Sequence, residues 1–588
     1  MAQLGEPVVL SADEKAWIVE FLQGLSEEES RISQQLARDH RGILLAGALK
    51  ELDLHETFIA ENGLEEELSH SFYFLSMGLR RLVILMLSLH SDFPFPAITM
   101  PRSEDLARRV ADLATMLGFI EHGRRVVELT WSGLSTITKV DPKLYRFEFP
   151  PRVIDAQAHE RGVEEHYRGI LQTELERNLF ETPEGKIRSE KIQESCLENV
   201  YVWRDLFMGY NADPFLDDIF FTIAWGQIAE TPQFDSFNEL KKFGGITYLK
   251  YLMSAAIVVS FALKHERFAA AMNVKYPDIP RGNVLTISAD REEFIDDLWR
   301  ALEEFGERFV HYTPTSRCEA EQLFRTVTLT RQNVGVASRP HAPLPVIVEF
   351  ASTSIVKLVS GRARQMEFLL DSLRRNFQSD YSSNQRGREA SLQRALTEFF
   401  QSIFPDVICR TNIKLRHRGR VLTDVDLVAF DPIYGDLMLF QLKHQDTPGP
   451  DLKTKNSRMP RFLRECIGWL DVVADWLGTA DETILRNAFR LPRGAKISRV
   501  RKLIVARHHA YPLAGAVIDE NVAYATWMQF YNAGKVMIAR QGNLRSMNGL
   551  FAILREHVVG APVRHHQEEQ PKRFRLHDLE YEIVPRRN

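Results

Sequence analysis

TDVDLVAFDPIYGDLMLFQLK, residues Thr423–Lys443, says more than any other part of this 588-residue sequence about the architecture of the C-terminal third. Two apolar runs with the composition of β-strands flank the connection Asp431–Asp436, which contains Pro, Gly and Asp residues typical of turns. A third run of this kind precedes them. We therefore predict an antiparallel meander of three strands, at Val407–Leu415, Val421–Phe430 and Leu437–Lys443.

Helical periodicity precedes the meander, because Leu392, Leu396 and Phe400 recur at spacings that form one apolar stripe. The elements expected around the meander are a helix at Arg388–Phe404, a helix at Arg461–Trp476, a strand at Lys502–Arg507 and a strand turning into a helix at Val522–Phe530. This order of helix, three strands, helix and further strands predicts an α/β domain over residues 386–545.

Polar side chains with a shared chemistry lie on two of the predicted strands. Side chains alternate across a strand, so Asp424 and Asp426 are expected on one face of the second strand, and Gln441 and Lys443 on one face of the third. If these strands pair, a carboxylate, an amide oxygen and an ammonium group converge. Phosphodiester hydrolysis uses such groups, because oxygen ligands hold a metal ion that acidifies water and a lysine orients or deprotonates the nucleophile.

Residues Thr423–Lys443, preceded by a helix with an early glutamate, resemble the PD-(D/E)xK nuclease superfamily, which has the restriction-endonuclease-like fold. The resemblance implies that Asp426 is the principal metal ligand, that Gln441 takes the place of the usual acidic residue, and that Lys443 is the catalytic lysine. It also implies that Leu442 offers its main-chain carbonyl to the metal and that Glu389 matches the helix glutamate. The implied cofactor is Mg²⁺ or Mn²⁺.

The sequence departs from the family pattern at Gln441, which supplies a neutral oxygen where a carboxylate would supply a charge. Some active branches of the family carry this variant, and Asp424 is positioned to compensate in part. Two alternatives remain open. The domain is either a nuclease fold that binds nucleic acid without turnover, or a fold in which Asp426 ends an apolar strand and Lys443 only leaves the sheet into solvent.

Five basic and no acidic residues fall within Arg410–Arg420, just before the proposed metal-ligand strand. A phosphate backbone is attracted to such a run, although exposed hairpin ends are often basic for solubility alone. The residues expected to contact nucleic acid, DNA in preference to RNA, are Lys414, Arg416, Arg418, Arg420, Arg461 and Arg464. Arg461 and Arg464 lie one helical turn apart, and a solvated helix face is the alternative for both.

Residues 1–340 are dominated by helical periodicity and are expected to form a recognition or assembly region, with a possible break near residue 150. Helices are expected at Ser11–Leu22, Leu64–Leu89, Glu104–Glu121, Val163–Phe180, Phe237–Met272 and Asp290–Phe309. The runs Val126–Thr130 and Leu144–Phe149 have β composition, compatible with a winged helix or with any hairpin that caps a helix. Residues 341–385 are expected to connect the two regions through a polar linker at 379–387. Residues 546–588 are expected to form a helix and a tail, either flexible or docked.

Composition limits the class of protein. The net charge of −5 and 44% hydrophobic residues are ordinary for a globular chain, and four cysteines without a CxxC pair indicate reduced thiols. No secretory leader is evident, and the apolar runs are shorter than a bilayer span, so we expect a cytoplasmic protein without membrane contact. His159, Glu164, Glu165 and His166 lack the spacing of a zinc hydrolase.

The sequence thus predicts a multidomain protein, with a mainly α-helical N-terminal region and a C-terminal α/β domain of restriction-endonuclease type. No nucleotide-binding glycine loop is present, so a helicase or sensor would be a separate partner, and a homo-oligomer is also compatible. The expected activity is metal-dependent DNA cleavage, for which a bacterial defence role is a suitable setting. The remaining alternative is a helical scaffold that binds protein partners.

Overall fold

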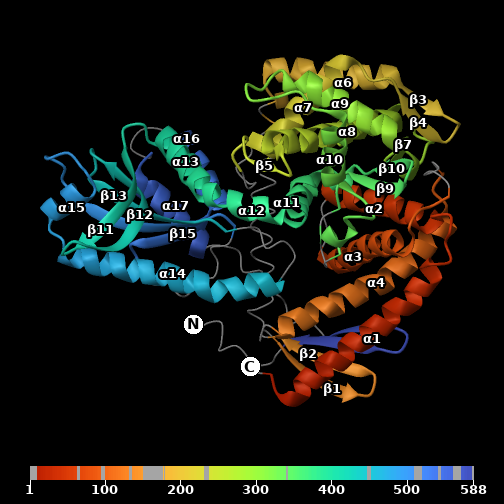
Figure 1. Ribbon diagram of the computed structural model, residues 1–588, viewed down its shortest axis with the longest axis horizontal. Helices are drawn as coiled ribbons and strands as arrows, with labels where there is room; N and C mark the ends of the chain where they lie inside the picture. The colour runs from red at the N-terminus through yellow and green to blue at the C-terminus, as the bar shows by residue number, and fades with distance from the viewer. Residues whose placement is uncertain are drawn as a thin grey trace.

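The chain is a mixed α/β protein, with helices dominating its N-terminal region and a five-stranded sheet near its C-terminus (Figure 1). The computed structural model describes residues 10–62, 66–94, 100–131, 135–149, 177, 179–230, 237–338, 342, 344–445, 452–508, 519–540, 545–559 and 571–585. Most of the predicted helix Val163–Phe180 and all of His159, Glu164, Glu165 and His166 therefore lie outside the described residues.

Four long helices form the first part of the chain: α1 (Ala12–Leu36), α2 (Ile43–Asn62), α3 (Glu66–Leu89) and α4 (Glu104–Trp131). The predicted start of α1 is confirmed, since Ser11 and Glu14 form a reciprocal capping box. Helices α3 and α4 approach so closely that a Cβ atom at Gly78 or Gly118 would collide with the backbone of the other helix. These helices share one core with the strands that follow.

The prediction of a β-run at Val126–Thr130 is wrong, because α4 continues to Trp131. Val126 and Val127 are buried in the helical core, and that packing outweighs the strand preference of β-branched residues. The Thr130 hydroxyl donates to the Val126 carbonyl, one turn back along the helix. The other predicted run is correct, since Leu144–Phe149 is strand β2, but its hairpin partner is β1 (Thr136–Asp141), which was not predicted.

A second helical core surrounds the apolar helix α8, which is buried along most of its length. The helices and strands of this part of the chain are α6 (Pro183–Asn199), β3 (Val200–Trp203), β4 (Phe207–Tyr210), α7 (Pro214–Trp225), β5 (Lys242–Phe243), β6 (Ile246–Thr247), α8 (Tyr248–Lys275), β7 (Ile287–Asp290), α9 (Arg291–Gly306), α10 (Arg317–Val327), β8 (Thr328–Leu329), β9 (Ile347–Ala351), β10 (Ser354–Lys357) and α11 (Gln365–Asn376). Strands β7, β10, β9 and β8 form one sheet in that order.

The polar segment 379–387, expected to be a linker, is helical. It is occupied by α12 (Gln378–Asn384) and by the start of α13 (Arg386–Ile403), and these two helices lead from the second core to the C-terminal sheet (Figure 1). Tyr381 of α12 is buried in the second core. The polar composition reflects the exposed side of these helices rather than an extended chain.

The C-terminal sheet has the order β11-β12-β13-β14-β15. Its strands and helices are β11 (Ile408–His417), β12 (Arg420–Asp431), β13 (Asp436–Lys443), α14 (Leu452–Thr479), α15 (Glu482–Ala488), β14 (Arg499–Ala506), β15 (Val522–Thr526), α16 (Trp527–Ala539) and α17 (Met547–Val559). The first three strands are antiparallel, whereas β14 and β15 continue the sheet in parallel. The predicted meander and the flanking helix-strand order are confirmed.

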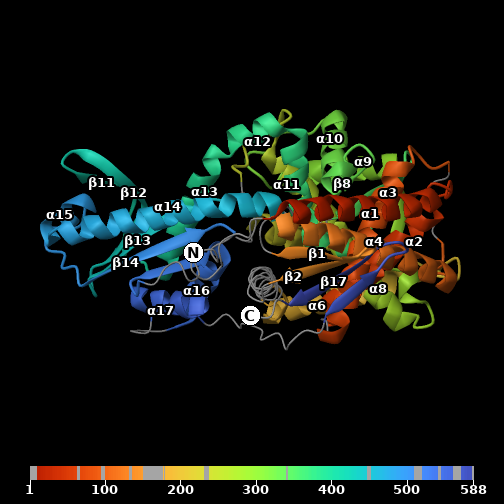
Figure 2. The ribbon, with the colours of Figure 1, turned by 90° about the horizontal axis from the view of Figure 1, so that it is seen from below.

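Helices cover both faces of this sheet. Apolar residues of α13, α16 and α17 pack with one face, and those of α14 and α15 pack with the other. Leu442 faces the first layer, and Leu439 faces the second. Figure 2 shows α14 running along the sheet toward the N-terminal helices, with which it is also in contact.

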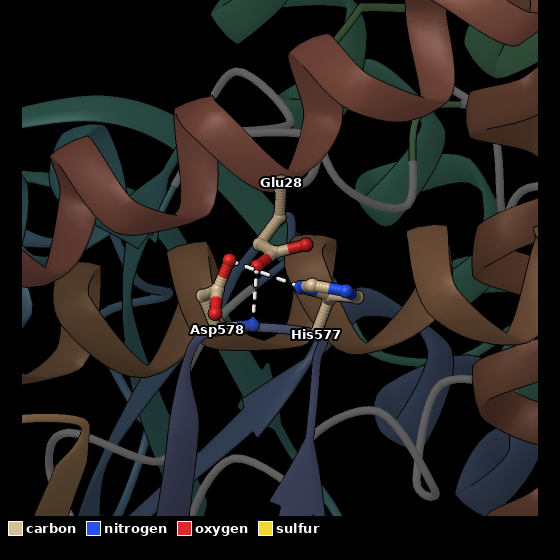
Figure 3. A group of neighbouring side chains, drawn as sticks. All are labelled: Glu28, His577 and Asp578. Atoms are coloured by element: carbon tan, nitrogen blue, oxygen red, sulfur yellow. Dashed lines mark hydrogen bonds and ion pairs between the residues drawn. The ribbon is translucent and has the colours of Figure 1, made fainter.

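The C-terminal tail is docked on the N-terminal region. Strands β16 (Lys572–Arg575) and β17 (Glu580–Pro585) form a hairpin, and β17 pairs in parallel with β2. Tyr581 is fully buried against α4, where its hydroxyl donates to the Phe119 carbonyl. At the hairpin turn, the Asp578 main-chain N–H donates to the Glu28 carboxylate of α1 (Figure 3).

One helical segment among the described residues, Phe72–Leu89, is long and apolar enough to cross a membrane. More than half of it (56%) is buried inside the protein, and Leu82, Val83 and Met86 belong to the first core. The segment therefore has the environment of a core helix.

Candidate active site

Three of the residues expected to form the site, Asp426, Gln441 and Leu442, meet where β12 and β13 separate. Their antiparallel pairing extends only as far as Leu427 and Phe440. Beyond that pair, the Asp426 carboxylate lies between the strands. Its Oδ2 accepts hydrogen bonds from Gln441 Nε2 (2.7 Å) and from the Leu442 main-chain N–H (2.6 Å).

The position of Asp426 results from an interruption in the sheet. Val425 packs in the same core layer as Val428, which strict alternation along a strand does not allow. Opposite this point, Asn412 of β11 has a φ of 55°, a backbone conformation that asparagine adopts more readily than most residues. The expectation that Asp424 and Asp426 share a face rested on strict alternation, which does not hold here.

Helix α13 supports this interruption through Gln393. The Gln393 side-chain amide donates to the Asp426 main-chain carbonyl and to the Asn412 side-chain oxygen (3.1 Å). Glu389 lies one turn earlier on α13 and is exposed, and it acts on Asp426 as a like charge. Its role as the helix glutamate that the resemblance implies stays a prediction.

The pKa of Asp426 is raised to about 6, chiefly by burial and in smaller part by the negative charges of Asp424 and Glu389. The hydrogen bond from the Leu442 N–H and the Lys443 ammonium act in the opposite direction. A partly buried carboxylate with other carboxylates nearby is an environment that a cation stabilises.

Lys443 leaves the sheet at the end of β13 and reaches α14. Its Nζ donates to Glu465 Oε2 (3.1 Å), and Glu465 Oε1 accepts from Arg461 Nε (2.7 Å). The Arg461 guanidinium, followed by Lys443, lowers the pKa of Glu465 below its ordinary value. Sequence reasoning noted Arg461 and Arg464 on this helix but missed Glu465, although it lies four residues from Arg461.

The basic hairpin between β11 and β12 extends away from Asp426. All four of its candidate residues are exposed: Lys414, Arg416, Arg418 and Arg420. Arg420 lies six residues from Asp426 along β12, a distance of roughly 20 Å in an extended strand. The hairpin is fixed near the far end of α14, where Trp476 Nε1 donates to the Arg416 carbonyl (3.0 Å).

Arg461 and Arg464 differ in their surroundings. The Arg461 side chain is 84% exposed and pairs with Glu465, which in turn contacts Lys443. The Arg464 side chain is also exposed, and among the described residues it forms no hydrogen bond or ion pair with the site. The structure thus brings Asp426, Gln441, Leu442 and Lys443 together, with Glu389 acting at longer range. It leaves the basic residues as an outer surface.

The donor atoms at this point suit a hard divalent cation. Within one strand residue the N–H and C=O point to the same neighbouring strand, so the Leu442 carbonyl faces the gap that holds the Asp426 carboxylate. Turning the Gln441 amide would present its oxygen to the same gap. A carboxylate, an amide oxygen and a main-chain carbonyl are the ligand types that Mg²⁺ and Mn²⁺ accept.

Among the described residues, the only group of three His, Cys, Asp or Glu side chains dense enough to hold a metal ion is Glu28, His577 and Asp578 (Figure 3). Arg31 pairs with both carboxylates of this group, and Lys143 pairs with Asp578 at 2.8 Å. These cations already balance the acidic charge, so the group fastens the C-terminal hairpin to α1.

Comparison with known proteins finds no matching family model, no matching curated protein and no matching solved structure. The residues of the chain and their geometry are therefore the basis for inferring its function.

Proposed function

We propose that this chain is a metal-dependent nuclease that hydrolyses phosphodiester bonds of DNA, with a C-terminal domain of the restriction-endonuclease type. The order of α13, the β11-β12-β13 meander, α14 and the parallel strands β14 and β15 supports this proposal. It agrees with the arrangement in which PD-(D/E)xK nucleases carry an acidic residue on the second strand and a lysine on the third.

The observation that carries the proposal is the Asp426 carboxylate between β12 and β13, bonded to Gln441 and to the Leu442 N–H, with Lys443 one residue further along. A partly buried carboxylate such as Asp426 contributes little to folding, because its desolvation costs free energy that offsets the gain from its hydrogen bonds. Binding of a cation after folding would account for its placement.

Asp426, the Leu442 carbonyl and the amide oxygen of Gln441 would hold Mg²⁺ or Mn²⁺, which supplies an acidified water and positive charge beside the scissile phosphate. Lys443 is placed to orient this water or to hold a phosphate oxygen once it leaves Glu465. Gln393 and Asn412 keep the Asp426 backbone in place. Each of these residues acts by binding or orientation.

The exposed basic residues indicate how a nucleic acid would lie. Arg461 and Arg464 flank the site on α14, and Lys414 lies two residues from Asn412, opposite the site on β11. The outer hairpin residues Arg416 and Arg418 would contact the phosphate backbone at the far end of the hairpin, roughly 20 Å from Asp426. The helical region would then act as the specificity or regulatory module.

The test is cleavage of plasmid and single-stranded DNA by the purified full chain with Mg²⁺, Mn²⁺ or EDTA. We expect metal-dependent cleavage that is lost in Asp426→Asn and in Lys443→Ala but retained in Arg493→Ala, a basic residue that is exposed elsewhere on the same domain. Binding without cleavage under every metal condition would instead indicate a nucleic-acid-binding protein without turnover. Neither binding nor cleavage would support the scaffold alternative.

A further inference from the structure

The metal site proposed above has a charge deficit. In the described part of the chain, the Asp426 carboxylate bonds across the gap between β12 and β13, and its partner on β13, Gln441, is neutral. Divalent cation sites gain affinity with the number of charged oxygen ligands, so one carboxylate gives a weak site. A second negative ligand would have to come from an element other than β13.

Helix α14 places a carboxylate beside the motif lysine. Lys443 interacts electrostatically with Asp426 and donates a hydrogen bond to Glu465 (3.1 Å), so it is coupled to both acidic groups. Glu465 is the only acidic residue in the described part of the chain for which an ion pair with Lys443 is present. It therefore approaches the site from the helix layer, opposite to Glu389.

The helix is fixed on the sheet at this point, whereas the Glu465 side chain is not. Cys466 is fully buried, and Trp469, one turn beyond Glu465, donates from Nε1 to the Asp424 carbonyl (2.8 Å). The Glu465 side chain is 41% exposed and is held by two cationic side chains, Lys443 and Arg461. These partners exchange readily with solvent or substrate, which leaves the carboxylate free to turn.

We propose that Glu465 supplies the second carboxylate of the metal site, replacing the charge that Gln441 lacks. When the cation is absent, Glu465 is paired with Lys443. When the cation binds, Glu465 turns toward it, and Lys443 and Arg461 become available to phosphate oxygens of the substrate. This inference depends on the proposed nuclease function, since it assumes that the cation binds at Asp426.

The test is titration calorimetry of Mn²⁺ with the full chain in the absence of nucleic acid. Glu465→Gln is expected to weaken Mn²⁺ binding at least about tenfold, because changes to groups that only support metal ligands already cost about 10–100-fold. The double variant Gln441→Glu/Glu465→Gln moves the carboxylate back to β13 and is expected to restore binding to near the wild-type value. Glu482→Gln is the matched control, since Glu482 is similarly exposed (48%) and pairs with Arg486 on α15.

Three outcomes would overturn the inference. If Asp426→Asn abolishes Mn²⁺ binding but Glu465→Gln leaves it unchanged, the Lys443–Glu465 pair only fastens α14 to the sheet. If Asp424→Asn weakens binding and Glu465→Gln does not, the second carboxylate is Asp424. If Asp426→Asn itself has no effect, the proposed nuclease site is also wrong, and this result separates the two failures.

Discussion

Replacing Asp426 by Asn is expected to stabilise the metal-free protein while removing the proposed activity. The pKa of Asp426 is raised to about 6 by burial, from an ordinary aspartate value of about 3.9. Between about pH 4 and pH 6, the folded state therefore still binds a proton that the unfolded chain has already released. The contribution of the protonated Asp426 carboxyl to the free energy of unfolding is complete below about pH 4 and is lost as the pH rises through 6.

The expected magnitude follows from this pKa difference. About two pKa units correspond to about 3 kcal/mol, because each unit is about 1.4 kcal/mol. Solvent reaches this partly buried side chain, so we expect the free energy of unfolding of Asp426→Asn to exceed that of the wild type by about 1–2 kcal/mol at pH 8. An Asn side chain still offers an oxygen to the Leu442 N–H.

The assay is chemical unfolding of wild type and Asp426→Asn in EDTA at pH 4 and pH 8, followed by a repeat at pH 8 with Mg²⁺. The difference should be absent at pH 4, appear at pH 8, and shrink with Mg²⁺, which stabilises only the wild type by about 1.4 kcal/mol at tenfold excess over its Kd. Asp436→Asn is the matched control with the opposite sign, because Asp436 is buried in the same sheet but paired with Arg499 (2.7 Å). An Asp426→Asn variant no more stable than wild type at pH 8 in EDTA would refute the reasoning.

Three further predictions concern the helical region and its junctions. Arg388→Ala is expected to lower the free energy of unfolding by about 2–3 kcal/mol, measured by chemical denaturation, because the buried guanidinium stacks on Phe237; Arg394→Ala, exposed on the same helix, is expected to change it by less than about 0.5 kcal/mol. Tyr581→Phe should lower stability by about 1–2 kcal/mol in the same assay, since it removes a buried hydroxyl that bonds the Phe119 carbonyl. Burial lowers the pKa of His265 to about 4, so below about pH 6.5 the unfolded chain takes up a proton before the folded state does. The free energy of unfolding should therefore fall by about 2–3 kcal/mol between pH 6.5 and pH 4, and unfolding curves of His265→Gln should lack most of this decrease.

The sequence was sufficient to predict the meander because its strands carry their own signals. Apolar β-branched runs and the turn at Asp431–Asp436 are local features, and strand β12 differs from its predicted range Val421–Phe430 by only one residue at each end. Pairing those strands also predicted that Asp426, Gln441 and Lys443 lie close together, and neither prediction requires knowledge of the rest of the chain. The interruption of β12 that places the Asp426 carboxylate between the strands was not predicted, because strict alternation was assumed.

Other features depend on contacts between distant residues, which no local pattern encodes. Glu465 meets Lys443 only because of the rotation of α14 on the sheet, and β17 pairs with β2 across more than 400 residues. The helical state of Val126–Thr130 likewise depends on burial within the first core, which outweighs local strand preference. Tertiary packing decides each of these points.

The start of α13 links the helical region to the candidate site. Arg388 is buried against Phe237 and Tyr381 of the second helical core, while the next residue, Glu389, acts on the charge of Asp426. Consecutive residues on a helix point about 100° apart, so one turn serves both regions. If a partner shifted the second core, Glu389 would move with it, and the charge balance at Asp426 would change without any contact to the sheet.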